Sequence, residues 1–186
     1  MKRILSLVLM IALLLPIIGS ATTTTRTYIT DLSTFIQRYN AVMKEIEFKE
    51  IYGVDPSLDE KSLTISKGDV NDTIQFQLPN YSDGVLQLNL KGGTKNIVGI
   101  WMFLPTRGDT KAPQFLLEMF AGLTHGAGVA EAGKDVVEIM YELGMYKQGA
   151  LADGKDVSLV VDGVKYGYYT MIFGDLPFMM GYAEAE

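Results

Sequence analysis

Apolar and polar residues alternate with a period of two in three successive segments of this chain, residues 62–66, 73–78 and 86–90. Successive side chains of a β-strand point to opposite faces, so this pattern predicts strands with one buried and one polar face. Residues 97–104 are apolar on both sides and predict a more central strand. The connections between these segments are of hairpin length, which predicts an antiparallel sheet.

Three further segments carry apolar residues at helical spacing. The clearest is residues 31–47, with Thr30 or Asp31 placed to cap it. A second helix begins near Pro113, and a third contains the stripe of residues 136–143. Helix formation is weakened by glycine, and three glycines predict a break around residues 124–133: Gly122, Gly126 and Gly128.

The C-terminal part again has strand character. Residues 157–161 and 164–173 flank Asp162-Gly163, a two-residue hairpin signal, and a last short strand is expected at 178–182. The order of elements predicts an α+β fold, a twisted antiparallel sheet with the helices packed on one face. Helix followed by meander occurs twice, from about residue 31 and from about residue 112, as in TATA-binding-protein-like and beta-lactamase-inhibitor-like folds. We therefore consider two helix-plus-meander halves.

Residues 1–21 have the order of a secretory signal peptide. Lys2 and Arg3 precede an apolar run at 4–18, which is shorter than the ~20 residues of a spanning helix, and Gly19-Ser20-Ala21 provides small residues for cleavage. The alternative is an uncleaved N-terminal anchor. We expect cleavage, export to the periplasm or the extracellular space, and a mature single domain at residues 22–186 without a membrane span.

The composition narrows the classes of partner. The chain has no cysteine and a net charge of −6, which becomes more negative without Lys2 and Arg3. An acidic balance argues against nucleic acid as a partner, because nucleic acid attracts clustered Lys and Arg. The lack of cysteine means that an exported fold depends on packing rather than on disulfides, which fits a bacterial export route.

The sequence contains few candidates for catalysis or for metal and cofactor binding. His125 is the only histidine, within Thr124-His-Gly-Ala-Gly128, and no Gly-x-Ser-x-Gly motif accompanies it. The clusters at 69–72 and 55–60 contain Asp residues but lack the calcium-loop pattern, and turn formation explains them equally well. We predict no catalytic residue, no metal site and no cofactor. A secreted hydrolase that uses carboxylates or His125 stays as the alternative function.

The C-terminal region is rich in aromatic residues and is the remaining candidate for a binding surface. Tyr166 and Tyr168 share one face of their predicted strand, and Tyr169 points to the other. If helices cover one face of the sheet, one of these sets lies on the uncovered side, where aromatic clusters mark contact surfaces. Burial of both sets is the alternative. The candidate binding residues are Tyr166, Tyr168, Tyr169 and Trp101.

Two segments, Phe35–Met43 and Gly68–Thr73, together with the order of elements, give the chain a resemblance to small uncharacterised secreted bacterial proteins. This resemblance implies export but no activity. The leading hypothesis is a non-catalytic binding protein, secreted or associated with the cell envelope, with an unknown ligand. Self-association is a further possibility.

Overall fold

The computed structural model describes residues 26–78, 84–105, 112–147, 154, 156–173 and 176–186. The predicted signal peptide and residues 22–25 lie outside the described residues. The helices are α2 (Leu32–Glu45), α3 (Phe48–Tyr52), α4 (Ala112–Gly126) and α5 (Val136–Glu142), with 3₁₀ turns η1 (Glu60–Ser62) and η2 (Val129–Ala132). The strands are β1 (Thr30–Asp31), β2 (Ile65–Ser66), β3 (Asn71–Gln77), β4 (Val85–Lys91), β5 (Asn96–Pro105), β6 (Asp156–Val161), β7 (Val164–Phe173) and β8 (Leu176–Ala185).

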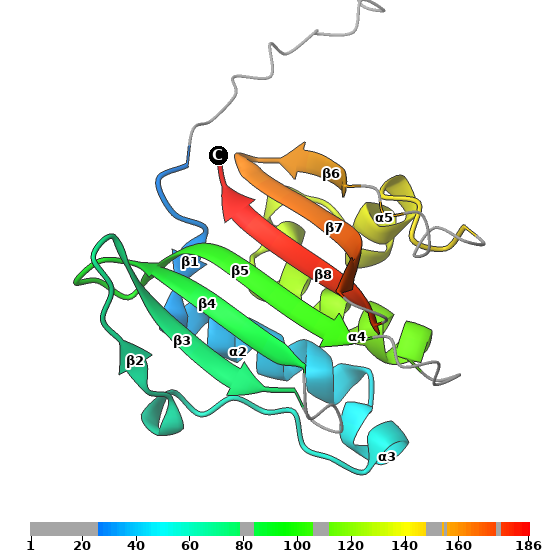
Figure 1. Cartoon of the computed structure of the whole chain (residues 1–186), viewed down its shortest axis with the longest axis horizontal. Helices are drawn as coiled ribbons and strands as arrows, with labels where there is room; N and C mark the ends of the chain where they lie inside the picture. The colour runs from blue at the N-terminus through cyan, green and yellow to red at the C-terminus, as the bar shows by residue number, and fades with distance from the viewer. Residues whose placement is uncertain (1–25, 79–83, 106–111, 148–153, 155, 174–175) are drawn as a thin grey trace, which may run out of the picture.

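The strands form one antiparallel sheet in the order β2-β3-β4-β5-β8-β7-β6, and β1 pairs with β5. Helices α2 and α4 both lie behind this sheet in Figure 1. The predicted α+β class, with an antiparallel sheet covered by helices on one face, is confirmed. The two predicted halves are visible as α2 with β3–β4–β5 and α4 with β6–β7–β8. They meet where β5 pairs with β8.

The first predicted strand is shorter than expected. Residues 62–66 were predicted to be extended, but Glu60–Ser62 form η1 and only Ile65–Ser66 pair with β3. The side chain of Asp59 accepts a hydrogen bond from the Lys61 backbone N–H, and the Ser62 N–H donates to the Asp59 carbonyl. These local bonds compete with extended pairing, so the alternating pattern alone is misleading here.

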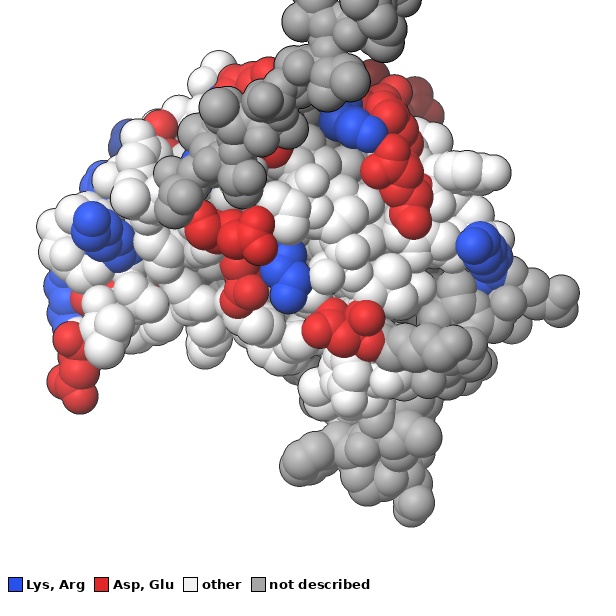
Figure 2. Space-filling view, turned by 90° about the horizontal axis from the view of Figure 1, so that it is seen from above, with Lys and Arg blue, Asp and Glu red and all other residues white. Residues whose placement is uncertain are grey.

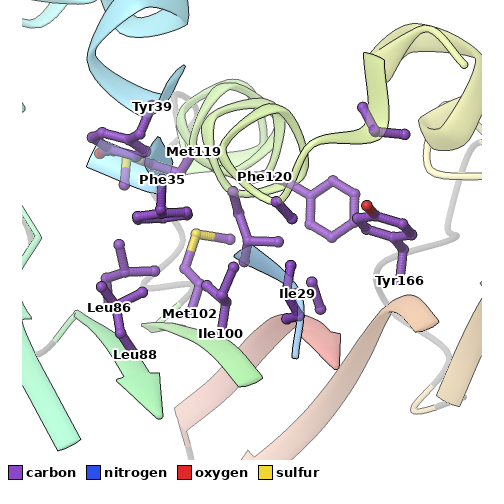
Figure 3. Close-up of a cluster of buried hydrophobic side chains, with 14 of the residues drawn as sticks. Ile29, Phe35, Tyr39, Leu86, Leu88, Ile100, Met102, Met119, Phe120 and Tyr166 are labelled. Carbon is purple, nitrogen blue, oxygen red and sulfur yellow. The ribbon is translucent and has the colours of Figure 1, made fainter. Parts of the chain in front are cut away.

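The core fills the space between the sheet and the helices (Figure 3). Leu86, Leu88, Ile100 and Met102 rise from the sheet, and each is at most 1% exposed. Phe35 and Tyr39 of α2 and Met119 and Phe120 of α4 meet them from above (Figure 3). Side chains of both helices and of both halves of the sheet belong to one core cluster. The two halves therefore bury their apolar side chains against each other.

Two glycines of α4 allow α2 to approach closely. A Cβ atom on Gly126 would lie 2.5 Å from the Phe35 ring, and one on Gly122 would lie 2.9 Å from the Tyr39 ring. The predicted break around residues 124–133 is therefore misplaced at its start, since α4 continues to Gly126. The helix-weakening effect of glycine is offset here by the burial of the facing aromatic rings.

We predict that Gly126→Ala destabilises the protein by about 1–3 kcal/mol, as overpacking of a core does. The Phe35 ring is fully buried and cannot move aside. Urea denaturation monitored by circular dichroism measures the change.

A double-mutant cycle with Phe35→Leu provides the control, because a smaller side chain at residue 35 leaves room for the new methyl group. The two changes should then be less destabilising together than the sum of their separate effects. An increase in stability from Gly126→Ala alone, as helix propensity predicts, would contradict the close-contact explanation.

A buried carboxylate joins two hairpins at the β3 end of the sheet. Asp72 is 3% exposed and accepts hydrogen bonds from Lys67 Nζ at 2.6 Å and from the Gly93 backbone N–H at 3.2 Å. The Lys67 bond is the main cause of a lowered pKa for Asp72. Asp72 thus belongs to the hairpin structure rather than to a calcium loop.

Asp72→Asn should lower the free energy of unfolding near neutral pH. A carboxyl group with a lowered folded-state pKa stabilises the protein above its unfolded pKa of about 4, and this contribution is lost as the pH falls through the lower folded-state value. The stability difference between wild type and variant should therefore shrink at about pH 2. Asp69→Asn, which removes an exposed charge from the same hairpin, is the matched control for urea unfolding at both pH values. Equal effects of the two variants would contradict this role for Asp72.

Candidate functional site

The four predicted binding residues lie on opposite faces of the sheet. Tyr166 and Tyr168 are 1% and 2% exposed and belong to the core, and Figure 3 shows Tyr166 on the helix side with Phe120. Neither side chain is accessible on the surface of the folded protein, because alternation along β7 places both under the helices. Trp101 and Tyr169 lie on the other face and are partly exposed.

We call the face of the sheet opposite α2 and α4 the open face (Figure 1). On β5, β8 and β7 it carries an unusually apolar set of side chains. Strand register brings them together, since Trp101 pairs with Tyr182, and Phe103 pairs with Met180, which pairs with Tyr169. All members are partly exposed except Tyr182, which is 3% exposed. The aromatic cluster of the open face consists of Trp101, Phe103, Tyr169, Met171, Phe178, Met180 and Tyr182.

The centre of this cluster is the contact between Trp101 and Tyr182. Their ring centroids are 5.7 Å apart, and the ring planes differ by 28°. The Tyr182 hydroxyl donates a hydrogen bond to Asp156 Oδ1 at 2.6 Å, across β7. Lys165 Nζ lies 5.6 Å from the Tyr182 ring centroid, which is cation–π distance. Tyr182 is thus held on several sides and supports Trp101.

Glycines in the strands make room for these rings. A Cβ atom on Gly167 would lie 2.5 Å from the Tyr182 hydroxyl oxygen, so the phenol ring passes directly over that residue. A Cβ atom on Gly99 would lie 3.1 Å from Trp101 Nε1 and 3.3 Å from Asn89 Nδ2. Glycine inside a strand marks a close approach of this kind. The sheet therefore lets the aromatic rings lie close to its backbone.

A row of carboxamides lies beside the aromatic cluster. Gln75 of β3 pairs with Gln87 of β4, and Gln87 pairs with Trp101 of β5. Gln75 Nε2 donates to Gln87 Oε1 at 2.6 Å, and Gln87 Nε2 donates to Asn89 Oδ1 at 2.8 Å. We call Gln75, Gln87 and Asn89 the amide row. Sequence reasoning missed it, although the polar positions of the predicted strands 73–78 and 86–90 contained the signal.

Charged groups lie mainly on the β6 side of the open face. The pKa of Glu184 is raised, chiefly because the carboxyl group is partly buried, with a smaller contribution from Asp156 and an opposing one from Lys165. Burial, followed by the hydrogen bond to Asp156, raises the pKa of Tyr182 to about 12. Tyr182 is therefore a neutral hydrogen-bond donor at physiological pH.

The other sequence candidates lie elsewhere. His125 is in the last turn of α4 and is partly buried, on the helix layer and away from the open face. The side chain of Asp55 accepts from the Ser57 N–H and Asp59 caps η1, as turn residues do. Among the described residues, no three His, Asp or Glu side chains gather as a metal site would require.

A polar hollow of about 440 Å³ lies where the described chain begins, between the segment Arg26–Asp31 and α2. Its two arginines already have acidic partners, Arg26 with Asp162 and Arg38 with Glu131. In the view of Figure 2, charges of both signs lie in small mixed groups separated by uncharged surface. Neither arginine of this hollow is therefore free to bind an anion.

Comparison with models of protein families, with curated proteins and with solved structures gives no match. In the part of the chain that the structure describes, each helix is too short or too polar to cross a membrane.

Asp156→Asn should lower the pKa of Tyr182 from about 12 part of the way toward the usual value of about 10. Asparagine can still accept the hydrogen bond of the phenol, but it carries no negative charge to repel the tyrosinate. The burial of the ring is unchanged and keeps part of the pKa shift. NMR titration of ring-labelled tyrosine measures the change. Glu131→Gln, which removes a negative charge on the helix side, should leave this pKa unchanged. An unaltered Tyr182 pKa in Asp156→Asn would exclude the coupling.

Proposed function

We propose that this protein is an exported, non-catalytic binding protein that recognises a component of the cell envelope or its surroundings through the open face. The observation that carries the proposal is the aromatic cluster on the side of the sheet that α2 and α4 leave uncovered. Signal-peptide order at residues 1–21 supports export.

The construction of the cluster favours binding over a purely structural role. A sheet face exposed to water usually carries polar side chains, whereas this face places Trp101, Phe103 and Tyr169 there with partial exposure. Aromatic residues and Met are enriched in contact surfaces, where they provide large and adaptable contact area. The strands beneath are central in the sheet, so the surface is carried on a rigid support.

The chemistry of the face favours binding over hydrolysis. The carboxylate of Asp156 accepts a hydrogen bond from the Tyr182 hydroxyl and positions that ring. His125, the candidate base, belongs to the helix layer. Catalysis requires reactive groups that converge on one substrate atom, and the most closely packed groups of the open face are aromatic.

The test is retention of the mature protein on envelope material in a sedimentation assay. Trp101→Ala and Tyr169→Ala should each reduce retention by about tenfold, the effect expected of truncating an aromatic contact residue. Tyr141→Ala is the matched control: Tyr141 is a 74% exposed aromatic residue on α5, and its loss should have no effect.

Two results would contradict the proposal. One is a wild-type protein that is not retained at all. The other is equal retention of the wild type and both open-face variants, with folding verified by circular dichroism.

A further inference from the structure

We infer that the ligand of the open face is a glycan chain, a β-linked polysaccharide strand that lies across β3, β4 and β5 and is contacted there at uncharged sugar units. This inference rests on the proposed binding function and names the chemical class of the ligand. Three features carry it: a single line of residues across four strands, the unused hydrogen-bonding capacity of the amide row, and the aromatic surface next to it.

Strand register places these residues in one line, in which Gln75, Gln87 and Trp101 are accessible and the buried Tyr182 supports Trp101. Gln75 pairs with Gln87, Gln87 with Trp101, and Trp101 with Tyr182. Neighbouring strands lie about 4.8 Å apart, so the accessible line from Gln75 to Trp101 is about 10 Å long. A line of this length matches an extended oligosaccharide of a few sugar units better than a compact small molecule.

The amide row has hydrogen-bonding capacity to spare. Each carboxamide carries two N–H donors and an oxygen acceptor, and the two bonds within the row use one N–H of Gln75 and one of Gln87. These internal bonds orient the amides. A sugar hydroxyl both donates and accepts, so a chain of hydroxyl groups can satisfy the remaining positions. An apolar protein surface packed on the row would bury them without partners, which is costly.

The aromatic part of the line complements the other face of a sugar. A pyranose ring with equatorial substituents has a flat, apolar C–H side that stacks on an aromatic ring. Trp101 provides such a ring, and it is supported by Tyr182 at 5.7 Å and accommodated by Gly99. Gln75, Gln87, Asn89 and Trp101 are all uncharged, so this half of the face is suited to a neutral ligand.

The chain contains one tryptophan, so its intrinsic fluorescence reports on this site directly. The probe is the soluble hexamer of β-1,4-linked N-acetylglucosamine, added to the mature protein. We expect a saturable change in Trp101 emission. Gln87→Leu and, independently, Gln75→Leu should each weaken binding by about tenfold, through the loss of ligand hydrogen bonds. Gln114→Leu, an exposed glutamine of α4, should bind as the wild type does.

Retention on envelope material before and after digestion separates this inference from the proposed function. Loss of retention after muramidase digestion of the glycan, with retention kept after protease treatment, supports a glycan ligand. Loss after protease alone identifies a protein partner and overturns the glycan inference, while the proposed function stands. Absence of retention together with an unchanged Trp101 emission overturns both. A saturable emission change that Gln75→Leu and Gln87→Leu do not weaken overturns the inference, because the amide row then lies outside the site.

Discussion

The pairing of β5 with β8 is the interaction on which the rest of the structure depends. It runs from Gly99 with Glu184 to Pro105 with Phe178 and joins two helix-plus-meander halves into one sheet. Because it is antiparallel and central, it brings α2 and α4 onto the same face, where they share one core. The same pairing aligns Trp101 with Tyr182 on the other face. Core and candidate site thus arise from opposite sides of one strand pair.

Glycine has a consistent role on both faces. Gly122 and Gly126 let α2 approach α4, and Gly167 lets the Tyr182 ring pass over β7. At Gly126 and Gly167 an aromatic ring occupies the space that a side chain would have taken, and at Gly122 the Met43 methyl group and the Tyr39 ring occupy it. Glycine within helices and strands is destabilising, and at these positions the close packing that it permits offsets this cost. This protein contains no cysteine and therefore no disulfide. Close packing of this kind therefore stabilises its fold.

Much of the fold could be predicted from local patterns. The helix at residues 31–47, the period-two strands at 73–78 and 86–90 and the Asp162-Gly163 hairpin all appear near the predicted positions, because these signals depend on neighbours within a few residues. The start of the break after α4 was misplaced, since the stability of its last turn depends on contacts with Phe35, nearly a hundred residues away. The open face was predicted only as two alternatives: alternation separates Tyr168 from Tyr169 but does not say which side the helices cover.

Local patterns along the chain specify the α+β class, the antiparallel hairpins and the separation of each strand into two faces, because backbone geometry and hydrophobic periodicity are local properties. The burial of Tyr166 and Tyr168 in the core, and the line formed by Trp101, Tyr182 and the amide row, follow from the way distant strands pair. Strand register is the cause. Which residues become neighbours across a sheet depends on how distant strands pair, and no local pattern in the chain specifies the pairing of β5 with β8.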